Sequence, residues 1–421
     1  MAGKSNLWNF RTLSLIVPVI ALFSACSANK AIVRITNPLS IDVTDAPVII
    51  ARETLSKGMQ MGSFNKVPAV FLPNGQALPS QADDLDGDGN WDELFFLFDV
   101  GANTHSELSV RLVRPQRLPV FKRRSNIRFA AILNDSVFEP LTMAKRLKPE
   151  EGSAAGRFQF EGPGWENDNV GFRNYFDTRN GMDVFGKLTT EMILDGVGVN
   201  EDYHAMQHWG MDILRVGASL GAGALALERN GMLHRVAPTA AGSADVIANG
   251  PLRSILRFSF NDWEADGDTL DIVHTVSIHG GAWYYESTVV VEGAPGPQTL
   301  VSGITAIDLP EKTATETKHD GGIVSLATFG NQAYAGEGLG MAIMAKKETY
   351  LGYSWLGPQE NPITNTFAVR MKACAGNPFT FRFYAVWEPS SHDFGHPGGF
   401  KKLLERDALL MAHPLKIEIE Y

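Results

Sequence analysis

Residues 379–387 read FTFRFYAVW, a run in which every second side chain is apolar and all of these but Ala385 are large. Successive side chains of a β-strand point to opposite faces, so a period of two predicts a strand whose one face packs against a core. Aromatic residues, which dominate this run, are enriched in strands. The run therefore indicates a strand in a packed sheet.

The same alternation recurs on both sides of this run, at residues 107–112, 255–260, 270–278, 283–291 and 415–421. Clusters of Gly, Pro, Asn and Asp separate these runs, as expected of turns between strands. Helical periodicity is clearest at residues 400–411, and residues 140–148 are expected to form at most a short helical turn. We therefore expect an all-β fold: a large antiparallel β-sandwich with few short helices.

The 421 residues carry a formal charge of −10 and include only two cysteines. A net negative chain lacks the basic face that phosphate neutralisation needs, which argues against nucleic acid as a partner. Two cysteines exclude a disulfide framework. No internal repeat is evident, and the least regular stretch is 117–164. We expect an N-terminal β subdomain over residues 35–125 and the large sandwich over 126–421.

The first 25 residues resemble a secretory signal, with Lys4 and Arg11 before the apolar segment LSLIVPVIALF at 13–23. That segment is too short for a stable membrane-spanning helix. Phe-Ser-Ala-Cys at 23–26 resembles a bacterial lipobox, which predicts lipidation of Cys26 and a tether over residues 26–34. The alternative is a plain signal peptide with an incidental cysteine. We expect an exported lipoprotein in the periplasm or at the cell surface, held to the membrane by its lipid anchor only.

An acidic loop at residues 84–92 has the spacing D-x-D-x-D-G-x-x-D. Calcium prefers several carboxylate and carbonyl oxygens, and glycine at the sixth position allows a tight turn. An EF-hand would place Glu at the twelfth position, where this chain has Phe95. A shortened structural Ca²⁺ loop is one interpretation, and an acidic surface hairpin is the other. Its ligands would come from Asp84, Asp86, Asp88, Asn90 and Asp92. No organic cofactor is indicated.

The densest chemical signal lies between residues 161 and 228, where aromatic, charged and amide side chains interleave with little periodicity. This mixture is typical of sugar sites, because aromatic faces stack on pyranose rings and polar groups hold hydroxyls. Arginine binds a carboxylate or sulfate with its planar fork. The pair His204 and His208 lacks the Glu of a zinc protease at position 205. Paired carboxylates such as Glu166 with Asp168, or Asp177 with Asp183, leave a glycosidase open.

The series GPxWEND, FRNYFDxRNxxDxFGK, YHxxxxWGMD and LxVGxSLGxG, between residues 162 and 223, resembles a family of bacterial lipoproteins known as a domain of unknown function. Members of that family are encoded beside polysaccharide-degrading enzymes. The group is similar to ulvan oligosaccharide dehydratase. The resemblance implies a fold like the galactose-mutarotase supersandwich, and elimination of water across C4 and C5 of a terminal uronate.

Such an elimination needs a base, an acid and positive charge near the substrate carboxylate. Tyr203 and His204 are the candidate acid and base, and His208 assists them. The remaining candidates bind the substrate: Arg173, Asn174, Arg179 and Lys187 as clamps on the uronate, Glu166 and Asp177 on hydroxyls, and Trp165 and Trp209 as stacking platforms. Two alternatives stay open: a glycoside hydrolase or epimerase with paired carboxylates, and a sugar-binding lipoprotein without catalysis.

Overall fold

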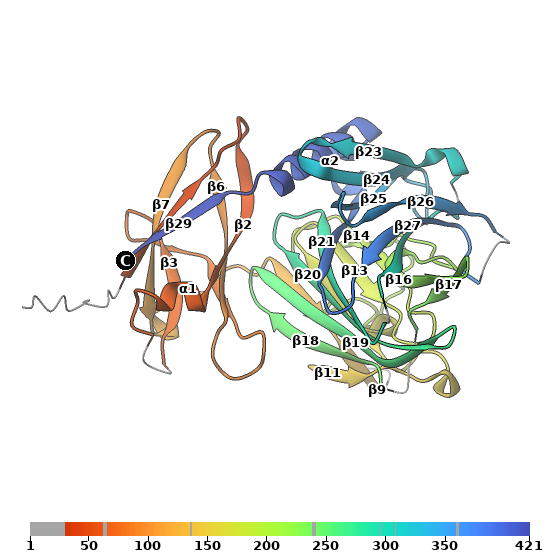
Figure 1. Ribbon diagram of the computed structural model, residues 1–421. Helices are drawn as coiled ribbons and strands as arrows, with labels where there is room; N and C mark the ends of the chain where they lie inside the picture. The colour runs from red at the N-terminus through yellow and green to blue at the C-terminus, as the bar shows by residue number, and fades with distance from the viewer. Residues whose placement is uncertain are drawn as a thin grey trace, which may run out of the picture.

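The computed structural model describes residues 30–61, 65–134, 137–237, 241–294, 296–307, 309–358 and 362–421. The expected signal segment and Cys26 lie outside these residues. The chain forms a small N-terminal module beside a much larger one (Figure 1). No helix in the described ranges is both long and apolar enough to cross a membrane.

The N-terminal module is a sandwich of two antiparallel sheets around its own core, which includes Val33, Val48, Phe96 and Val110. One sheet contains, in order, β29 (Lys416–Glu420), β1 (Lys30–Thr36), β7 (His105–Val113), β3 (Val67–Phe71) and β4 (Ala77–Leu78). The other contains β2 (Val43–Ala51), β6 (Glu93–Val100) and β5 (Ser80–Asp83), and a short helix α1 (Arg52–Ser56) follows β2.

Two segments differ from the expected division of the chain. Strand β1 begins at Lys30, inside the stretch expected to be a tether, because Ala31, Val33 and Ile35 alternate and are fully buried. The last strand, β29, pairs with β1 in the N-terminal module rather than with the large sandwich. Strand β29 lies at the edge of the sheet and gives β1 a second neighbour, so the first and last strands of the structure lie side by side.

The large module contains a nine-stranded antiparallel sheet. Its order is β11 (Met143–Lys145), β18 (Ser243–Asn249), β19 (Arg253–Ala265), β20 (Asp268–His279), β21 (Tyr284–Glu292), β28 (Phe379–Trp387), β25 (Leu339–Lys346), β24 (Ile323–Gly330) and β23 (Thr315–His319). Strand β11 lies where a helical turn was expected, because residues 143–145 pair with β18.

Two five-stranded sheets form the opposing layer. One contains β15 (Gly210–Asp212), β14 (Met182–Lys187), β13 (Val170–Asn174), β12 (Gly164–Asn167) and β8 (Ser125–Arg128). The other contains β17 (Met232–Arg235), β16 (Ala222–Arg229), β22 (Gln298–Thr305), β27 (Thr366–Ala373) and β26 (Tyr350–Leu356). A parallel bridge between Met182 and Gly221 joins the two. The predicted all-β, antiparallel sandwich is thus confirmed.

The remaining regular elements are small. Strands β9 (Ala130–Asn134) and β10 (Val137–Pro140) form a separate hairpin. The 3-10 helices span Pro115–Arg117, Pro149–Glu151, Gln159–Glu161, Glu311–Thr313, Asp320–Gly322, Glu388–Ser390 and His392–Phe394.

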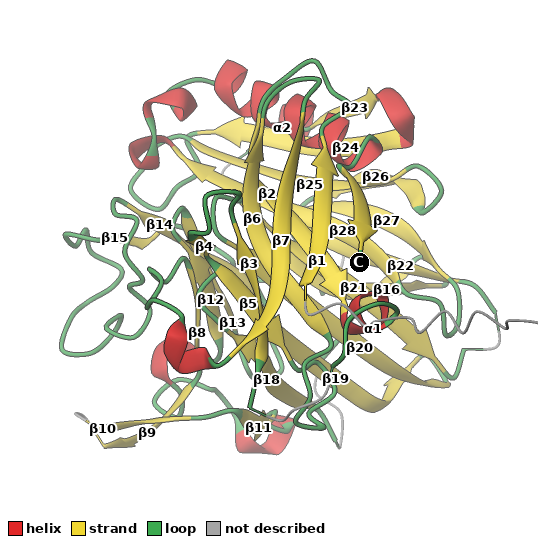
Figure 2. Cartoon of the chain, turned by 90° about the vertical axis from the view of Figure 1, so that its left-hand side faces the viewer, coloured by secondary structure: helices red, strands yellow, loops and turns green. Residues whose placement is uncertain are grey.

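Strand β28, the FTFRFYAVW run, lies inside the nine-stranded sheet, between β21 and β25. Its alternating residues Phe379, Phe381 and Phe383 enter the main core between the layers. Tyr384 and Val386 point to the other face, where helix α2 (Pro397–Ala412) packs with Phe400 and Leu404. Fully burying each such side chain contributes about 1.5–3 kcal/mol, which holds α2 on the sheet. The helix expected at residues 400–411 is therefore present, at the top of the view in Figure 2.

Ion pairs connect the two modules. Arg253 of β19 binds Asp83 and Glu93, which flank the acidic loop of the N-terminal module. Arg124 binds both Asp45 of the N-terminal module, at 2.5 Å, and Asp168, at 2.6 Å. Because Arg253 and Asp83 are buried, salt screens their ion pair only weakly. This contact helps to fix the position of one module relative to the other.

Candidate active site

A long loop, residues 188–209, connects β14 to β15 and carries Tyr203, His204 and His208. Hydrogen bonds to two buried side chains, Glu166 and Gln159, fix the first half of this loop. The carboxylate of Glu166 accepts hydrogen bonds from the backbone N–H groups of Ile193 and Leu194, each at 2.8 Å. The amide of Gln159 donates to the carbonyls of Leu194 and Val197. Buried side chains thus hold the loop where its second half can reach the surface.

Arg173 on β13 is the centre of the candidate site. Its guanidinium donates to Asp183 on β14, at 2.8 and 3.2 Å, and to Asp212 on β15, at 2.6 Å. All three side chains are almost completely buried. Antiparallel pairing brings them together, because Arg173 faces Asp183 directly in the β13–β14 register. One buried cation therefore serves two carboxyl groups.

One cation facing two carboxyl groups shifts the pKa values within the network. Burial, and then the neighbouring Asp183, raise the pKa of Asp212 well above its usual range. The protonated form of Asp212 is therefore favoured more than in an exposed carboxyl group. Burial opposes the charge on Arg173, but Asp212 and Asp183 raise its pKa overall, so it remains a cation. The hydroxyl of Tyr175 donates to Asp183 at 2.5 Å and completes the network.

Tyr203 and His204 form the solvent-facing edge of this network. Arg173 donates to the Tyr203 hydroxyl at 3.1 Å. Burial raises the pKa of Tyr203, although Arg173 acts in the opposite direction, so its phenol is protonated at neutral pH. Nε2 of His204 lies 3.7 Å from the Asp212 carboxyl, and about half of the side chain is exposed. The two rings are 4.3 Å apart between centroids.

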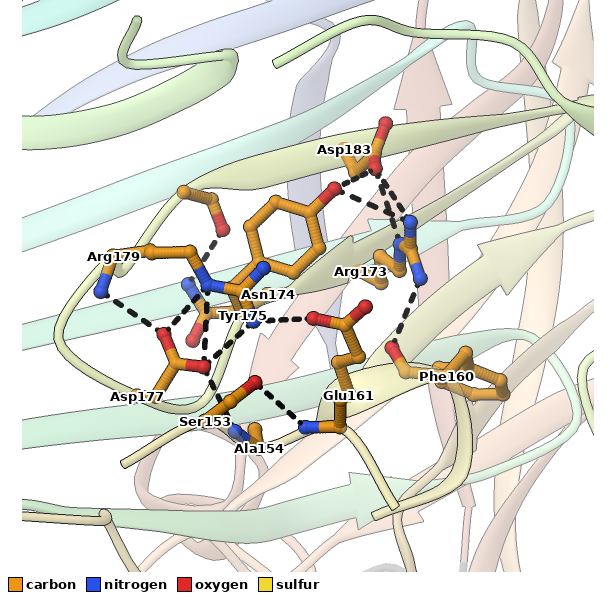
Figure 3. Close-up of polar contacts among 12 residues, drawn as sticks. Ser153, Ala154, Phe160, Glu161, Arg173, Asn174, Tyr175, Asp177, Arg179 and Asp183 are labelled. Carbon is orange, nitrogen blue, oxygen red and sulfur yellow. Dashed lines mark hydrogen bonds and ion pairs between the residues drawn. The ribbon is translucent and has the colours of Figure 1, made fainter. Parts of the chain in front are cut away.

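Arg179 and Asp177 extend the cluster on the far side of Tyr175 (Figure 3). Arg179 binds Asp177, at 2.6 Å, and Glu161. Its guanidinium carbon lies 4.4 Å from the centroid of the Tyr175 ring, and that of Arg173 lies 4.9 Å from it. Burial raises the pKa of Asp177, but Arg179 and backbone N–H groups lower it overall, so this carboxylate is ionised.

Seven residues expected to touch a sugar are instead buried. Two of them are Arg173 and Asp177, each 2% exposed and already bound within the network described above. Trp165 is 1% exposed, with its ring in the main core against Phe172 and Tyr285. Trp209 is 3% exposed and packs on Phe185. Asn174 is occupied by Arg146 and Asn180. Glu166 and Lys187 form an ion pair of 2.6 Å with no exposed surface. These side chains pack beneath the exposed edge of the site. The short strands β12, β13 and β14 are buried on both faces, so neither face is exposed to solvent.

The other predicted residues are placed as follows. His208 is exposed, and within the described ranges no hydrogen bond joins it to the Arg173 network. The proposed carboxylate pair of Glu166 and Asp168 is separated, since Glu166 binds Lys187 and Asp168 binds Arg124. Sequence reasoning missed Tyr175 and Asp212 as members of the site. Both stand in the quoted motifs, but nothing in their spacing indicates a shared arginine.

The acidic loop is a tight turn between β5 and β6. Carboxylate oxygens of Asp84, Asp86 and Asp88 lie within 4.8 Å of one another, as a cation site requires. Asp92 accepts the backbone N–H of Leu85 at 2.7 Å and thereby closes the loop. Three of the five predicted ligands thus converge, which fits a calcium-sized cation.

A family model described as "Domain of unknown function (DUF4861)" matches residues 35–417. The chain belongs to this family. Membership of a family of unknown function was expected from the motifs, and the match spans nearly all of both modules of this DUF4861 protein.

The DUF4861 protein is also similar to two solved structures. An alpha-mannosidase from Enterococcus faecalis V583 gives a TM-score of 0.46 at 10% identity, covering 94% of this chain and 47% of that one. A protein in glycosyl hydrolase family 38 from Enterococcus faecalis gives 0.47 at 10% identity, covering 94% and 48%. The chain thus spans about half their length, and the likeness is one of fold. The comparison with curated proteins finds no match.

Proposed function

We propose that this DUF4861 protein is a carbohydrate-active enzyme of bacterial polysaccharide degradation. In this proposal it eliminates water, or an alkoxide leaving group, from a uronate-containing oligosaccharide and leaves an unsaturated uronate. The resemblance of its motifs to ulvan oligosaccharide dehydratase suggests the reaction. The observation that carries it is the pairing of a half-exposed imidazole and a protonated phenol on one buried Arg–Asp–Asp network.

The two surface groups suit opposite proton transfers. His204 takes the proton at C5, next to the substrate carboxylate, because imidazole exchanges protons readily near neutral pH. Tyr203 gives its proton to the hydroxyl that leaves C4, since its phenol is protonated in the folded protein. The C4–O bond breaks as the C4=C5 double bond forms, and water departs. The proton on His204 then returns to Tyr203, directly or through solvent.

The buried network supports both steps. Arg173 donates to the Tyr203 oxygen, so it stabilises the phenolate that appears when Tyr203 loses its proton. The raised pKa of Asp212 lessens the negative charge set against that phenolate, and the Asp212 carboxyl lies 3.7 Å from Nε2 of His204. Arg179 is the candidate clamp for the uronate carboxylate, since 43% of its side chain is exposed. His208 remains a proposed assistant from the same loop.

The two carboxyl groups that share Arg173 are unsuited to hydrolysis by paired carboxylates, while the pair of Asp177 and Asp183 stays an open alternative. Asp183 and Asp212 accept hydrogen bonds from the same nitrogen of Arg173, at 2.8 and 2.6 Å. Both are buried, whereas glycosidase carboxyl groups flank the sugar at separations of about 5–9.5 Å. A sugar ring has no place between these two. Elimination by Tyr203 and His204 needs only the exposed edge.

Ultraviolet absorbance tests the reaction, because an unsaturated uronate absorbs and its saturated precursor does not. The protein is incubated with uronate oligosaccharides, and both absorbance and new reducing ends are followed. We expect absorbance to rise. Reducing ends without absorbance would indicate hydrolysis, and binding without any product would indicate a sugar-binding lipoprotein.

The variant His204→Ala tests the assignment of the base. Loss of a general base lowers kcat by roughly 10²–10⁴-fold, so turnover should fall by about that factor. The matched control is His392→Ala, because His392 is exposed in a 3-10 helix outside the site. Full turnover by His204→Ala on the true substrate would remove His204 from the mechanism.

A further inference from the structure

A pocket of about 360 Å³ opens beside the candidate active site. Arg179, Gly181, Val216, Gly217, Ala218, Arg235 and Pro362 line it. Two of these residues carry a guanidinium, and none of the lining residues that the structure describes carries a carboxylate. Arg179 connects it to the active site, because its guanidinium stacks on the Tyr175 ring, whose hydroxyl binds Asp183.

Arg235, at the end of β17, has an unusual environment for a half-buried arginine. Its Nη2 donates to the carbonyls of Ala218 and Ser219, at 2.8 and 2.9 Å. No carboxylate among the described residues forms an ion pair with it, whereas Arg253 has two such partners and Arg370 has one. Burial lowers the pKa of Arg235 to about 10, which still leaves it charged at neutral pH.

Donors on both arginines remain available to a ligand. The two carbonyls occupy only Nη2 of Arg235, so Nε and Nη1 form none of these hydrogen bonds. Arg179 uses Nε and Nη2 for Asp177 and Glu161, and its Nη1 likewise takes no part. An unpaired guanidinium that has lost part of its hydration binds oxyanions strongly, and its planar fork matches a carboxylate or a sulfate.

We propose that this pocket is a subsite for an anionic substituent of a sugar, a carboxylate or a sulfate, held jointly by Arg235 and Arg179. The inference deepens the proposed function and rests on it for the sugar. Arg235 supplies charge that no carboxylate in the described part of the chain pairs with, so the subsite selects charged over neutral oligosaccharides. The volume accommodates the oxyanion together with part of the ring that carries it.

Calorimetric binding tests the subsite without any turnover. The probes are methyl glucuronoside, glucose 6-sulfate, methyl glucoside and inorganic sulfate, all at constant ionic strength because screening changes such contacts. Variants are Arg235→Gln, Arg235→Lys and the control Arg111→Gln, which removes the same charge from the N-terminal module, where Arg111 stacks on Phe71. Thermal melting of each variant checks that it folds.

We expect the wild type to bind one of the charged sugars and not methyl glucoside. Arg235→Gln should weaken that binding about tenfold to a hundredfold, the effect of losing a charged hydrogen-bond partner, while Arg111→Gln leaves it unchanged. Arg235→Lys should restore part of the affinity, because it keeps the charge but not the fork. The sugar that responds, carboxylate or sulfate, identifies the substituent.

Three results would overturn the inference: equal affinity in folded Arg235→Gln and wild type, equal binding of methyl glucoside, or no binding of either charged sugar. The two proposals fail separately. Absent turnover with Arg235-dependent binding contradicts the elimination alone, and full turnover with Arg235-independent binding contradicts the subsite alone.

Discussion

The ion pair between Glu166 and Lys187 gives the sharpest test of how the fold supports the site. Glu166 accepts hydrogen bonds from Lys187, from the backbone of Ile193 and Leu194, and from Asn126, at distances of 2.6 to 3.2 Å. None of its side chain is exposed. The substitution Glu166→Gln keeps the shape, removes the charge and turns an amide donor toward groups that are themselves donors.

The expected loss of stability follows from that geometry. Removing one partner of a buried pair leaves the other charge unpaired, which costs about 3–5 kcal/mol. Domains typically have only about 5–15 kcal/mol of net stability, so Glu166→Gln should lose a large part of it. Because Glu166 also holds residues 193 and 194, the loop that carries His204 should loosen, and turnover should fall with stability.

The pH dependence identifies the orphaned group. Burial already lowers the pKa of Lys187, and Glu166 opposes that shift. Without Glu166 the folded pKa falls further below the unfolded value of about 10.4. Unfolding then takes up a proton, so stability rises with pH up to that value. The deficit of Glu166→Gln should therefore shrink between pH 7 and pH 10.

Urea denaturation followed by tryptophan fluorescence measures these effects. Lys187→Met added to Glu166→Gln should recover part of the loss, since it removes the unpaired charge. Glu107→Gln is the control, because its ion pair with Arg34 is exposed, and its midpoint should stay unchanged. A loss below about 1 kcal/mol in Glu166→Gln, or no recovery in the double variant, would refute the reasoning.

Three further predictions concern other parts of the chain. Burial lowers the pKa of His274 from 6.5 to about 3, so unfolding takes up a proton and stability should fall as pH drops through that window, by up to about 1.4 kcal/mol per pH unit; His274→Gln should flatten this slope in acid titrations of stability, and an unchanged slope would contradict it. Calcium at about a hundred times its dissociation constant, bound at the loop 84–92, should stabilise the folded protein by about 2.7 kcal/mol. Two results would argue against the site: a wild-type melting temperature that chelator leaves unaltered, or a melting temperature of Asp84→Asn that calcium still raises. Metabolic labelling with a fatty acid should mark the wild type and not Cys26→Ala, and an unlabelled wild type would remove the proposed anchor.

The regular alternation of residues 379–387 was enough to predict the class of fold. A strand that packs one face against a core repeats its apolar residues with a period of two wherever it occurs in the chain, so the pattern survives without knowledge of neighbours. The convergence of the acidic loop also follows from local sequence, because Asp84, Asp86 and Asp88 lie within five residues and the turn itself brings their carboxylates together. Calcium binding there stays a prediction.

The segment 161–212 was readable only in part. Its composition correctly pointed to a dense polar cluster, and Arg173, Tyr203 and His204 do meet there. Which residues face solvent could not be predicted, because β12, β13 and β14 are buried on both faces and so have no alternation to mark an outer side. Trp165 and Lys187 were therefore assigned to the surface although they lie in the interior.

The sequence by itself thus determined the class of fold, several of its strands, the convergence of the acidic loop and the chemical types gathered in the middle of the chain. Only the tertiary structure decided the partners. Asp212 binds Arg173 although 39 positions separate them in the sequence, and β29, the last strand, pairs with β1, the first. Arg235, at the end of β17, and Arg179, in the turn between β13 and β14, line the same pocket. The physical reason is that charge and burial act between neighbours in space, and a buried cation shared by two carboxyl groups exists only after the strands have paired.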